Sequence, residues 1–259
     1  MTTPVQLALT SNLPLRISYA DTLVQQLQLK LSPLNNDLLQ LVVTDDHVEL
    51  RAHDLGNAIL IDFVSGKNAH RRQFGGGRGQ PLAKAIGLKK GATPTIIDAT
   101  AGFARDAFVL ANLGCQITLI ERNPLIATLI EDALLRAAND DDIAEVIQRM
   151  SLINYDAIEY LTKLDKQNRP EVIYMDPMYP SREKSALVKK DMRLLHQLAG
   201  PDTDSEQLLE AARKTALKRV VVKRPKSAPF VGEQKPATSI ESKNTRYDIY
   251  LSSLNKGKK

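Results

Sequence analysis

The feature that most constrains the fold is a regular alternation of short β-branched runs with longer helical segments in the larger, C-terminal part of the chain. Strands are predicted at residues 95–99, 116–121, 151–154, 171–175, 219–223 and 246–251, and helices at 105–113, 124–138, 185–198 and 205–216. Strands that alternate with helices form βαβ units, which build a mainly parallel sheet. We therefore expect an α/β domain, doubly wound, with enough sequence between about residues 90 and 255 for seven strands.

The first part of the chain lacks this alternation. Two apolar-rich runs, 37–43 and 47–52, flank Thr44-Asp45-Asp46, a pattern that predicts a hairpin. Residues 57–64 predict a third strand, and residues 20–29 predict a helix. We therefore predict two units. They are a small β-rich N-terminal unit (1–80) that ends in a basic glycine-rich loop, and a main domain (81–259).

The composition is that of a folded protein without a disulfide or a membrane anchor. The 259 residues are 43% hydrophobic and 25% charged, and no apolar run approaches the roughly 18 residues of a membrane span. No basic segment precedes an apolar stretch at the N-terminus, which argues against a signal peptide. The single cysteine, Cys115, excludes an intrachain disulfide, and four histidines with one cysteine cannot form a standard zinc site. We expect a cytoplasmic protein with no metal and no membrane partner.

Positive charge is concentrated in two stretches. Between residues 63 and 97 there are seven basic side chains and no acidic one, and a more mixed basic stretch covers 182–226, whereas acids cluster at 131–145. This segregation favours a positive face with a polyanionic partner, but a solvated face without a partner explains it equally well. The candidate phosphate ligands are Arg71, Arg72, Arg78, Lys184, Lys189, Lys190, Arg193, Lys223 and Arg224.

Residues that directly follow the predicted strands are the best candidates for a ligand site, because parallel sheets bind ligands at the carboxyl ends of their strands. The loop at 98–106 contains small residues, which let a ligand approach backbone amides at a helix N-terminus. Glu121, about 20 residues further on, suits ribose hydroxyls. Asp156 suits an adenine ring or, equally, a helix N-cap. Gly102 is the one glycine present of the three in the dinucleotide fingerprint, which disfavours a nicotinamide-dependent oxidoreductase.

The most specific feature is Asp176-Pro177-Met178-Tyr179-Pro180, directly after the strand predicted at 171–175. The two prolines stiffen the turn and leave the Asp176 carboxylate and the Pro177 carbonyl as acceptors. A planar amine placed there would donate its N–H groups to these acceptors and stack on Tyr179. The alternative is a proline-rich surface turn, but the position at the ligand-binding edge favours a functional site.

These motifs resemble class I S-adenosylmethionine-dependent methyltransferases, and the Asp-Pro-x-Tyr turn is similar to the (D/N)PP(Y/F) motif of enzymes that methylate exocyclic or amide nitrogens. Longer blocks at residues 69–79, 98–102, 184–190, 219–225 and 246–250 resemble the ribosomal RNA small subunit methyltransferase J family, which methylates guanine N2 in 16S rRNA. The resemblance extends from about residue 54 to near the C-terminus. One departure is Ala104, where glycine is expected.

The resemblance implies a Rossmann-like class I fold, S-adenosylmethionine as cofactor, and 16S rRNA or the small ribosomal subunit as partner. Matching positions imply cofactor contacts at Asp98, Gly102, Arg105, Asp106, Glu121, Arg122, Asp156, Ala157 and Asp176. They also imply a catalytic turn of Asp176, Pro177 and Tyr179. The alternatives are a nitrogen methyltransferase for DNA adenine or a protein amide, and a non-catalytic ribosome assembly factor.

Overall fold

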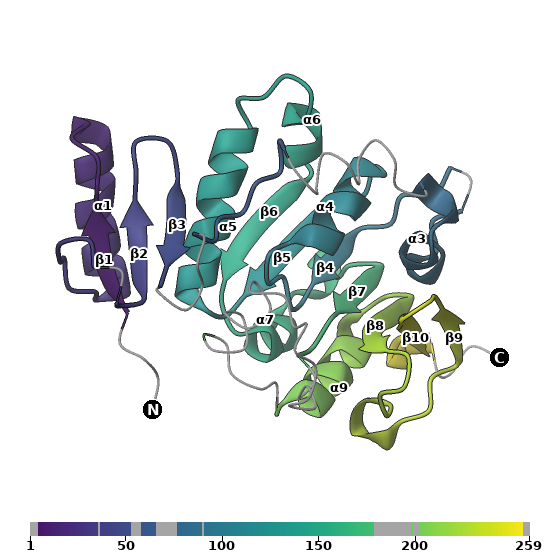
Figure 1. Cartoon of the computed structure of the whole chain (residues 1–259). Helices are drawn as coiled ribbons and strands as arrows, with labels where there is room; N and C mark the ends of the chain where they lie inside the picture. The colour runs from purple at the N-terminus through teal and green to yellow at the C-terminus, as the bar shows by residue number, and fades with distance from the viewer. Residues whose placement is uncertain are drawn as a thin grey trace.

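The centre of the protein is a seven-stranded sheet with the strand order β6-β5-β4-β7-β8-β10-β9 (Figure 1). The computed structural model describes residues 5–35, 37–52, 58–65, 77–89, 91–178, 198 and 203–255. The strands of this sheet are β4 (Ile96–Asp98), β5 (Ile117–Glu121), β6 (Met150–Asn154), β7 (Val172–Met175), β8 (Arg219–Pro225), β9 (Thr238–Glu241) and β10 (Thr245–Leu251). The first five pair in parallel, and β10 pairs antiparallel with β8 and β9. The predicted mainly parallel, seven-stranded α/β fold is confirmed.

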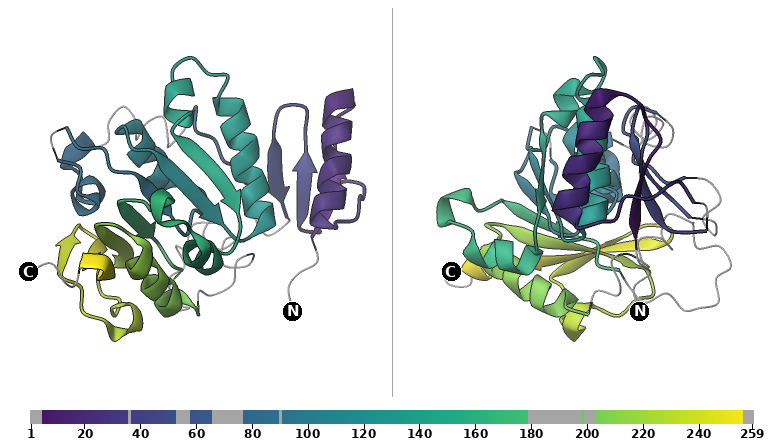
Figure 2. Two further views of the ribbon diagram at one scale, coloured as in Figure 1. Left: turned by 180° about the vertical axis from the view of Figure 1, so that it is seen from behind. Right: turned by 90° about the vertical axis from the view of Figure 1, so that its left-hand side faces the viewer.

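Helices cover both faces of this sheet (Figure 2). On one face α4 (Arg105–Asn112) and α5 (Pro124–Ala137) pack on the sheet, and on the other face α7 (Ala157–Lys163) and α9 (Ser205–Thr215) do so. Successive residues of a strand point to opposite faces. Accordingly, Tyr174 belongs to the first hydrophobic cluster, whereas Ile173 belongs to the second. Shorter helices are α3 (Pro81–Ile86) and α6 (Ala144–Ile147).

Local sequence explains where the two helices beside the central strands begin. Asn123 Oδ1 accepts hydrogen bonds from the backbone N–H groups of Leu125 (3.0 Å) and Ile126 (3.3 Å), and Pro124 occupies the first turn of α5. Asp156 Oδ1 accepts a hydrogen bond from the Glu159 backbone N–H at 2.9 Å, which caps α7. Both helices therefore start directly after a strand end, which sets the positions of the loops at the edge of the sheet.

A second, three-stranded sheet at the N-terminus has the order β1-β2-β3. It contains β1 (Gln6–Leu9), β2 (Gln40–Val43) and β3 (Val48–Arg51), with α1 (Pro14–Leu27) beside it. The predicted hairpin is confirmed, because β2 and β3 pair antiparallel across the turn at Thr44. The helix is also present, although it begins at Pro14, six residues before the predicted start at residue 20.

The predicted third strand at 57–64 is wrong. Of this range the structure describes residues 58–64, which contribute one bridge, between Leu50 and Ile59, and no strand. The Asp62 carboxylate accepts hydrogen bonds from the backbone of Val64 (2.8 Å) and Ser65 (3.1 Å), which turns the chain away from an extended path. The third strand is instead β1, which runs parallel to β2.

The N-terminal sheet packs beside α5 and shares a hydrophobic cluster with α4 and α5 (Figures 1 and 2). The rings of Phe63 and Phe108 stack with centroids 5.0 Å apart. Asp132 of α5 pairs with Arg16 of α1 at 3.7 Å and with Arg136 at 2.8 Å. The predicted division at residues 80 and 81 stays a prediction, and the described residues form a continuous core across it.

The helix predicted at 185–198 lies outside the described residues, apart from residue 198 itself. None of the helices in the described ranges combines the length and the apolar character that crossing a bilayer requires.

Candidate active site

A cavity of about 260 Å³ lies at the carboxyl ends of β4, β5 and β7, where the strand order reverses around β4. Ligands bind at such a switch point in open α/β sheets. Nine predicted cofactor positions line this one cavity: Asp98, Gly102, Arg105, Asp106, Glu121, Arg122, Asp156, Ala157 and Asp176. The cavity therefore brings together residues that are up to 78 positions apart in the sequence, from Asp98 to Asp176.

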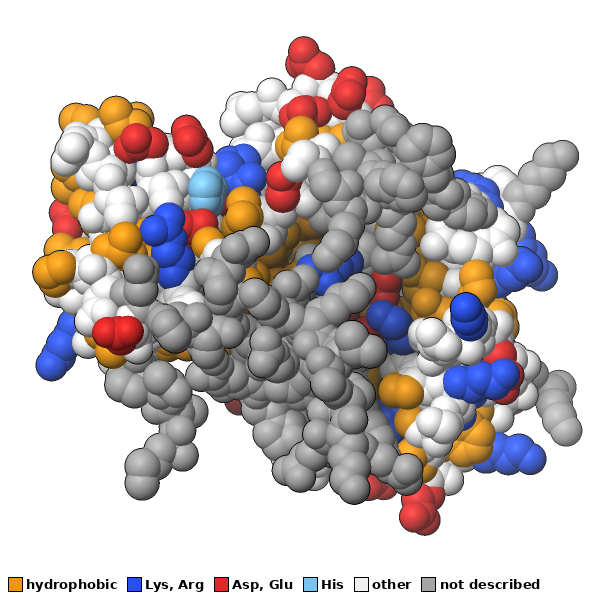
Figure 3. All heavy atoms as spheres, in the orientation of Figure 1, with side chains coloured by type: hydrophobic (Ala, Val, Ile, Leu, Met, Phe, Trp, Pro, Cys, Tyr) orange, Lys and Arg blue, Asp and Glu red, His pale blue; other side chains and the backbone are white. Residues whose placement is uncertain are grey.

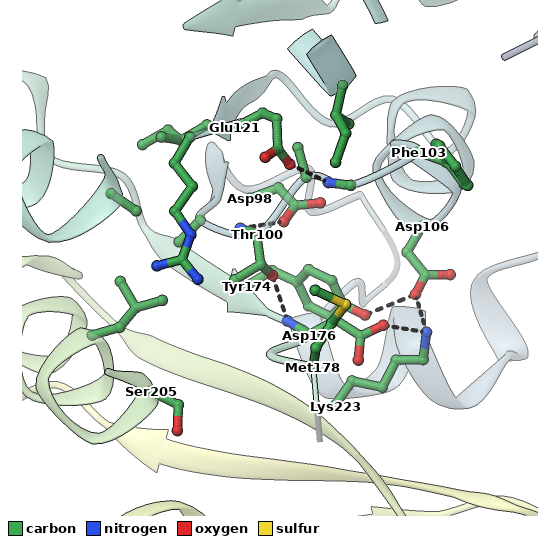
Figure 4. A pocket seen from close by; sticks show the side chains of 18 of the residues that line it. Asp98, Thr100, Phe103, Asp106, Glu121, Tyr174, Asp176, Met178, Ser205 and Lys223 are labelled. Carbon is green, nitrogen blue, oxygen red and sulfur yellow. Dashed lines mark hydrogen bonds and ion pairs between the residues drawn. The ribbon is translucent and has the colours of Figure 1, made fainter. Parts of the chain in front are cut away.

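Glu121 holds the loop after β4 in place. Its carboxylate accepts hydrogen bonds from the backbone N–H groups of Gly102 (Oε2, 2.9 Å) and Asn123 (Oε1, 2.8 Å), and the residue is 6% exposed (Figure 4). The Ala101 N–H also donates to the Ile120 carbonyl at 3.1 Å. The end of β5 thus positions both the loop after β4 and the start of α5. This tight loop needs a positive φ at Gly102, which is 51°.

Ala104 explains why glycine is expected at the start of α4. It has a φ of 52°, in the left-handed region, and its backbone N–H donates to Ala101 at 2.7 Å. The alanine methyl makes this conformation costly by about 1–2 kcal/mol. Ala104 is buried and does not line the cavity. Alanine in place of the expected glycine therefore adds backbone strain but does not change the surface that a ligand contacts.

Asp98 is a buried acid, 3% exposed, at the end of β4. Burial raises the pKa of its carboxyl to about 8; the hydrogen bond from the Thr100 N–H opposes this rise, and the nearby charges of Asp106, Asp176 and Glu121 add to it. A cavity lined by several carboxylates at short range favours a ligand that carries positive charge.

The carboxylates of Asp106 and Asp176 converge on one lysine (Figure 4). Lys223 Nζ donates to Asp176 Oδ2 at 2.7 Å and to Asp106 Oδ2 at 2.8 Å. Burial raises the pKa of the Asp176 carboxyl, and the Lys223 charge opposes that rise without cancelling it. The Tyr174 hydroxyl donates to the same Asp106 oxygen at 2.7 Å, and burial raises the pKa of that phenol well above 10. Four side chains therefore form one hydrogen-bonded group: Tyr174 of β7, Asp176 directly after β7, Lys223 of β8 and Asp106 of α4.

The backbone of the predicted catalytic turn is also fixed. The Asp176 N–H donates to Thr100 Oγ1 at 2.6 Å, and the Thr100 N–H donates to Asp98 Oδ1 at 3.1 Å. Pro177 follows directly, and Met178 lines the cavity. Tyr179 lies outside the described residues. The turn and the loop after β4 are thus joined through one threonine.

Several predicted phosphate ligands, namely Arg71, Arg72, Lys184, Lys189, Lys190 and Arg193, lie outside the described residues. Arg78 donates to the main-chain carbonyls of Lys89 (2.9 Å) and Ala92 (2.8 Å), which gives it a structural contact. Arg224 is buried, 6% exposed, and donates to the Pro229 carbonyl at 3.2 Å.

Lys223 is the residue that the sequence argument placed differently from the structure. The basic stretch predicts a phosphate ligand at this position, yet the Lys223 ammonium lies in the cavity between two carboxylates. Lys223 lies near the carboxyl end of β8. The rule that ligands bind at the carboxyl ends of parallel strands would therefore have predicted it as a cavity residue, as it did for the others. Tyr174 and Asp204 also line the cavity and had no comparable signal.

The cavity fits S-adenosylmethionine in its chemistry. Toward β5 it is lined by apolar side chains, including Ile120, Ile126 and Ile158, which suit a planar base. Toward β7 and β8 it is lined by Asp106 and Asp176, which suit a cationic tail. Among the described residues, no three His, Cys, Asp or Glu side chains are grouped so that they could hold a metal ion.

Comparisons with known proteins agree with this geometry. A family model described as "Putative SAM-dependent methyltransferase" matches residues 22–252. The ribosomal RNA small subunit methyltransferase J of Aeromonas salmonicida is 55% identical over 215 residues, which cover 82% of this chain and 85% of that protein. The enzyme of the same name from Shewanella amazonensis is 50% identical over 244 residues, covering 92% of this chain and 97% of that protein.

A solved structure is similar over nearly the whole chain. It is the SAM-dependent methyltransferase NGO1261 from Neisseria gonorrhoeae, with a TM-score of 0.77, 33% sequence identity, and coverage of 98% of this chain and 99% of that one. Together with the cavity at the switch point, these similarities show that the chain belongs to the ribosomal RNA small subunit methyltransferase J family, a family of S-adenosylmethionine-dependent methyltransferases.

Proposed function

We propose that this protein transfers a methyl group from S-adenosylmethionine to the exocyclic N2 of a guanine in 16S rRNA. The names of its relatives support ribosomal RNA of the small subunit as the substrate. The observation that carries the proposal is the Asp176 carboxylate, whose side chain is 40% exposed beside the cofactor cavity and is fixed by Lys223. The same substrate supports a cytoplasmic location.

The residues proposed to hold the cofactor divide by chemistry. Glu121 accepts ribose hydroxyls, in addition to the backbone groups it already fixes, and Ala157 with Ile158 forms part of the apolar slot for the base. At the other end of the cavity, the carboxylates of Asp98 and Asp106 balance the positive charge of the cofactor. When bound, S-adenosylmethionine supplies an electrophilic methyl group on a sulfonium.

Asp176 and Pro177 are the proposed catalytic pair. The guanine N2 lone pair is delocalised into the ring, so the amino group is a poor nucleophile and must be positioned. The Asp176 carboxylate and the Pro177 carbonyl accept its two N–H groups and stabilise the positive charge that develops on nitrogen. Such positioning supplies several kcal/mol of the barrier. No covalent enzyme intermediate is needed.

The target base must leave its stack or lie in an unpaired loop to reach this cavity, which costs a few kcal/mol. Stacking on Tyr179 offsets part of this cost, since a base–aromatic stack is worth about 1–3 kcal/mol. We propose that phosphates bind the basic residues Arg71, Arg72, Lys184, Lys189 and Lys190. On the face in Figure 3, described Lys and Arg side chains gather near α3 and β8–β10, whereas acidic ones gather at the α5–α6 connection.

The Asp176→Ala variant tests the proposal. We expect turnover on 16S rRNA to be lost while RNA affinity stays within about threefold of the wild type, because the carboxylate contacts the reacting amine and not the phosphates. Asp165→Ala, which removes an exposed carboxylate before the turn at Lys166–Asn168, is the matched control and should be fully active. Retained methyl transfer by Asp176→Ala would refute the role of Asp176. RNA binding by the wild type without any transfer would favour an assembly factor.

A further inference from the structure

We propose that Lys223 is a positioning residue that orients the Asp176 carboxylate toward the substrate amine. This inference rests on the proposed function, because it assigns to Lys223 a role in that same methyl transfer. It departs from the role that the basic stretch suggested, which was a phosphate contact.

Lys223 is fixed from two sides. It is near the carboxyl end of β8, and its ammonium bridges Asp176, which follows β7, and Asp106 of α4, at 2.7 and 2.8 Å. The side chains of Lys223 and Asp106 are 28% and 10% exposed, so both ends of the Asp106–Lys223 contact are largely enclosed. Asp106 in turn accepts the Tyr174 hydroxyl at 2.7 Å. The lysine therefore has one defined position, seen below the Tyr174 ring in Figure 4.

This contact uses one oxygen of Asp176 and leaves the other. Lys223 donates to Oδ2, and among the residues that the structure describes no hydrogen-bond donor reaches Oδ1. The backbone N–H of Asp176 is held separately by Thr100 Oγ1 at 2.6 Å. With its main chain and one carboxylate oxygen both anchored, Asp176 presents Oδ1 in a single orientation, which is what a positioned amine acceptor needs.

Lys223 also favours the charged form of Asp176. In the described part of the chain, the ionisable groups that act on Asp176 or on the neighbouring Tyr174 include Asp98 of β4, Asp106 of α4, Arg224 of β8 and Tyr247 of β10. Burial and the negative charge of Asp106 both favour a protonated Asp176, which would donate rather than accept a hydrogen bond. The Lys223 ammonium at 2.7 Å opposes this protonation.

Lys223 does not itself take the substrate proton. Burial alone lowers the pKa of its amine, but the charges of Asp176 and Asp106 outweigh that effect and raise the pKa above its usual value. The N2 lone pair forms the new N–C bond as the C–S bond breaks, and the C–S electron pair stays on sulfur. The cationic N2 then loses one proton to Asp176 Oδ1, from which it passes to solvent, while Lys223 stays protonated throughout.

The test compares Lys223→Met with Lys223→Arg and with the control Lys218→Met. Lys218 is exposed at the other end of β8 and pairs with Glu171. For Lys223→Met we expect kcat to fall about 10²-fold, since misplacing a reacting group by about 1 Å has that effect, while KM for RNA changes less than threefold. Its pH–rate profile should shift to higher pH, because Asp176 then ionises later. Lys223→Arg should recover at least a tenth of the wild-type kcat.

Two results would overturn the inference. One is a Lys223→Met enzyme with the wild-type kcat and pH profile. The other is a raised KM for RNA with an unchanged kcat, which would return Lys223 to a phosphate contact. If the wild type itself transfers no methyl group to 16S rRNA, the proposed function fails instead. The pairing is then tested by unfolding Lys223→Met, Asp176→Asn and the double variant: non-additive effects support the pairing, and additive effects contradict it.

Discussion

At the scale of single residues, the cavity contains several acids that raise one another's pKa. One lysine, Lys223, donates hydrogen bonds to two of them and opposes the rise at Asp176. The charges of Asp106 and Asp176 contribute to the raised pKa of Asp98, and Asp106 contributes to that of Asp176. Binding of a cationic ligand favours the ionised acids, so ligand affinity and proton release are coupled. The ligand-free protein is therefore the state in which these acids cost the most stability.

The raised pKa of Asp98 should change how the stability of the protein depends on pH. Its folded pKa of about 8 lies above the ordinary value of 3.8. Between these values the folded protein holds a proton that the unfolded chain has released, so this carboxyl makes the free energy of unfolding fall as pH rises. Asp98→Asn should flatten the fall in Tm between about pH 5 and 8.5 in the absence of ligand. Thermal unfolding scans check this, and parallel Tm curves for the two proteins would contradict the assignment.

Glu121 should matter to cofactor binding through the loop it holds. Glu121→Ala removes the acceptor for the N–H groups of Gly102 and Asn123. Hydrogen bonds to a charged group are worth about 1.5–3 kcal/mol each. We expect the affinity for S-adenosylhomocysteine, measured by calorimetry, to fall at least tenfold. Glu131→Ala, on the exposed side of α5, is the control, and equal affinities for the two variants would count against this role.

The sequence predicts which residues line the cavity where the direction of the strands determines their position. Residues after parallel strands must meet at one edge, which is why Asp98, Glu121, Asp156 and Asp176 were found from the sequence. The direction of a side chain within a strand is not fixed by composition. Lys223 and Arg224 are adjacent basic residues, yet one lies in the cavity and the other is buried against Pro229.

At the scale of elements, strong periodicity and capping made the central elements predictable. The predicted bounds of α4, α5, β5 and β7 agree with the structure within one residue at each end. The strands β1 and β9, which lie at the edges of their sheets, were missed. The strand predicted at 57–64 is wrong, and the Asp62 side chain turns the backbone near the end of that range.

Ala104, directly before α4, has a strained backbone conformation, and a substitution can remove this strain. Ala104→Gly removes the methyl that opposes a φ of 52°, at the cost of more freedom in the unfolded chain. We expect a net stabilisation of about 0.5–1 kcal/mol in urea unfolding. Ala107→Gly, inside the same helix, should destabilise by about 1 kcal/mol. A destabilised Ala104→Gly protein would show that the strain is absent.

At the scale of the whole molecule, the N-terminal sheet and the main sheet share one apolar cluster around α4 and α5. Phe63 and Phe108 stack within it, and Arg136 Nη2 donates to the Ile61 carbonyl at 2.6 Å. The sequence predicted a β-rich N-terminal unit but not this shared core, since packing between distant segments has no local signal.

The shared core predicts how the protein unfolds. Phe63→Ala should lower the free energy of unfolding by about 3–5 kcal/mol, the cost of deleting a buried aromatic ring. Because both sheets rely on the same cluster, we expect one cooperative transition in the wild type and the variant, seen by circular dichroism and calorimetry. Two separated transitions, with one unaffected by Phe63→Ala, would show that the two sheets unfold independently.

The most direct test of the central claim is transfer of a labelled methyl group from S-adenosylmethionine to undermethylated 30S subunits, naked 16S rRNA and duplex DNA in parallel. The account predicts label in at least one ribosomal sample, recovered as N2-methylguanine after nucleoside digestion and absent with Asp176→Ala. Label in DNA alone, or no label in any sample despite measurable cofactor binding, would contradict it.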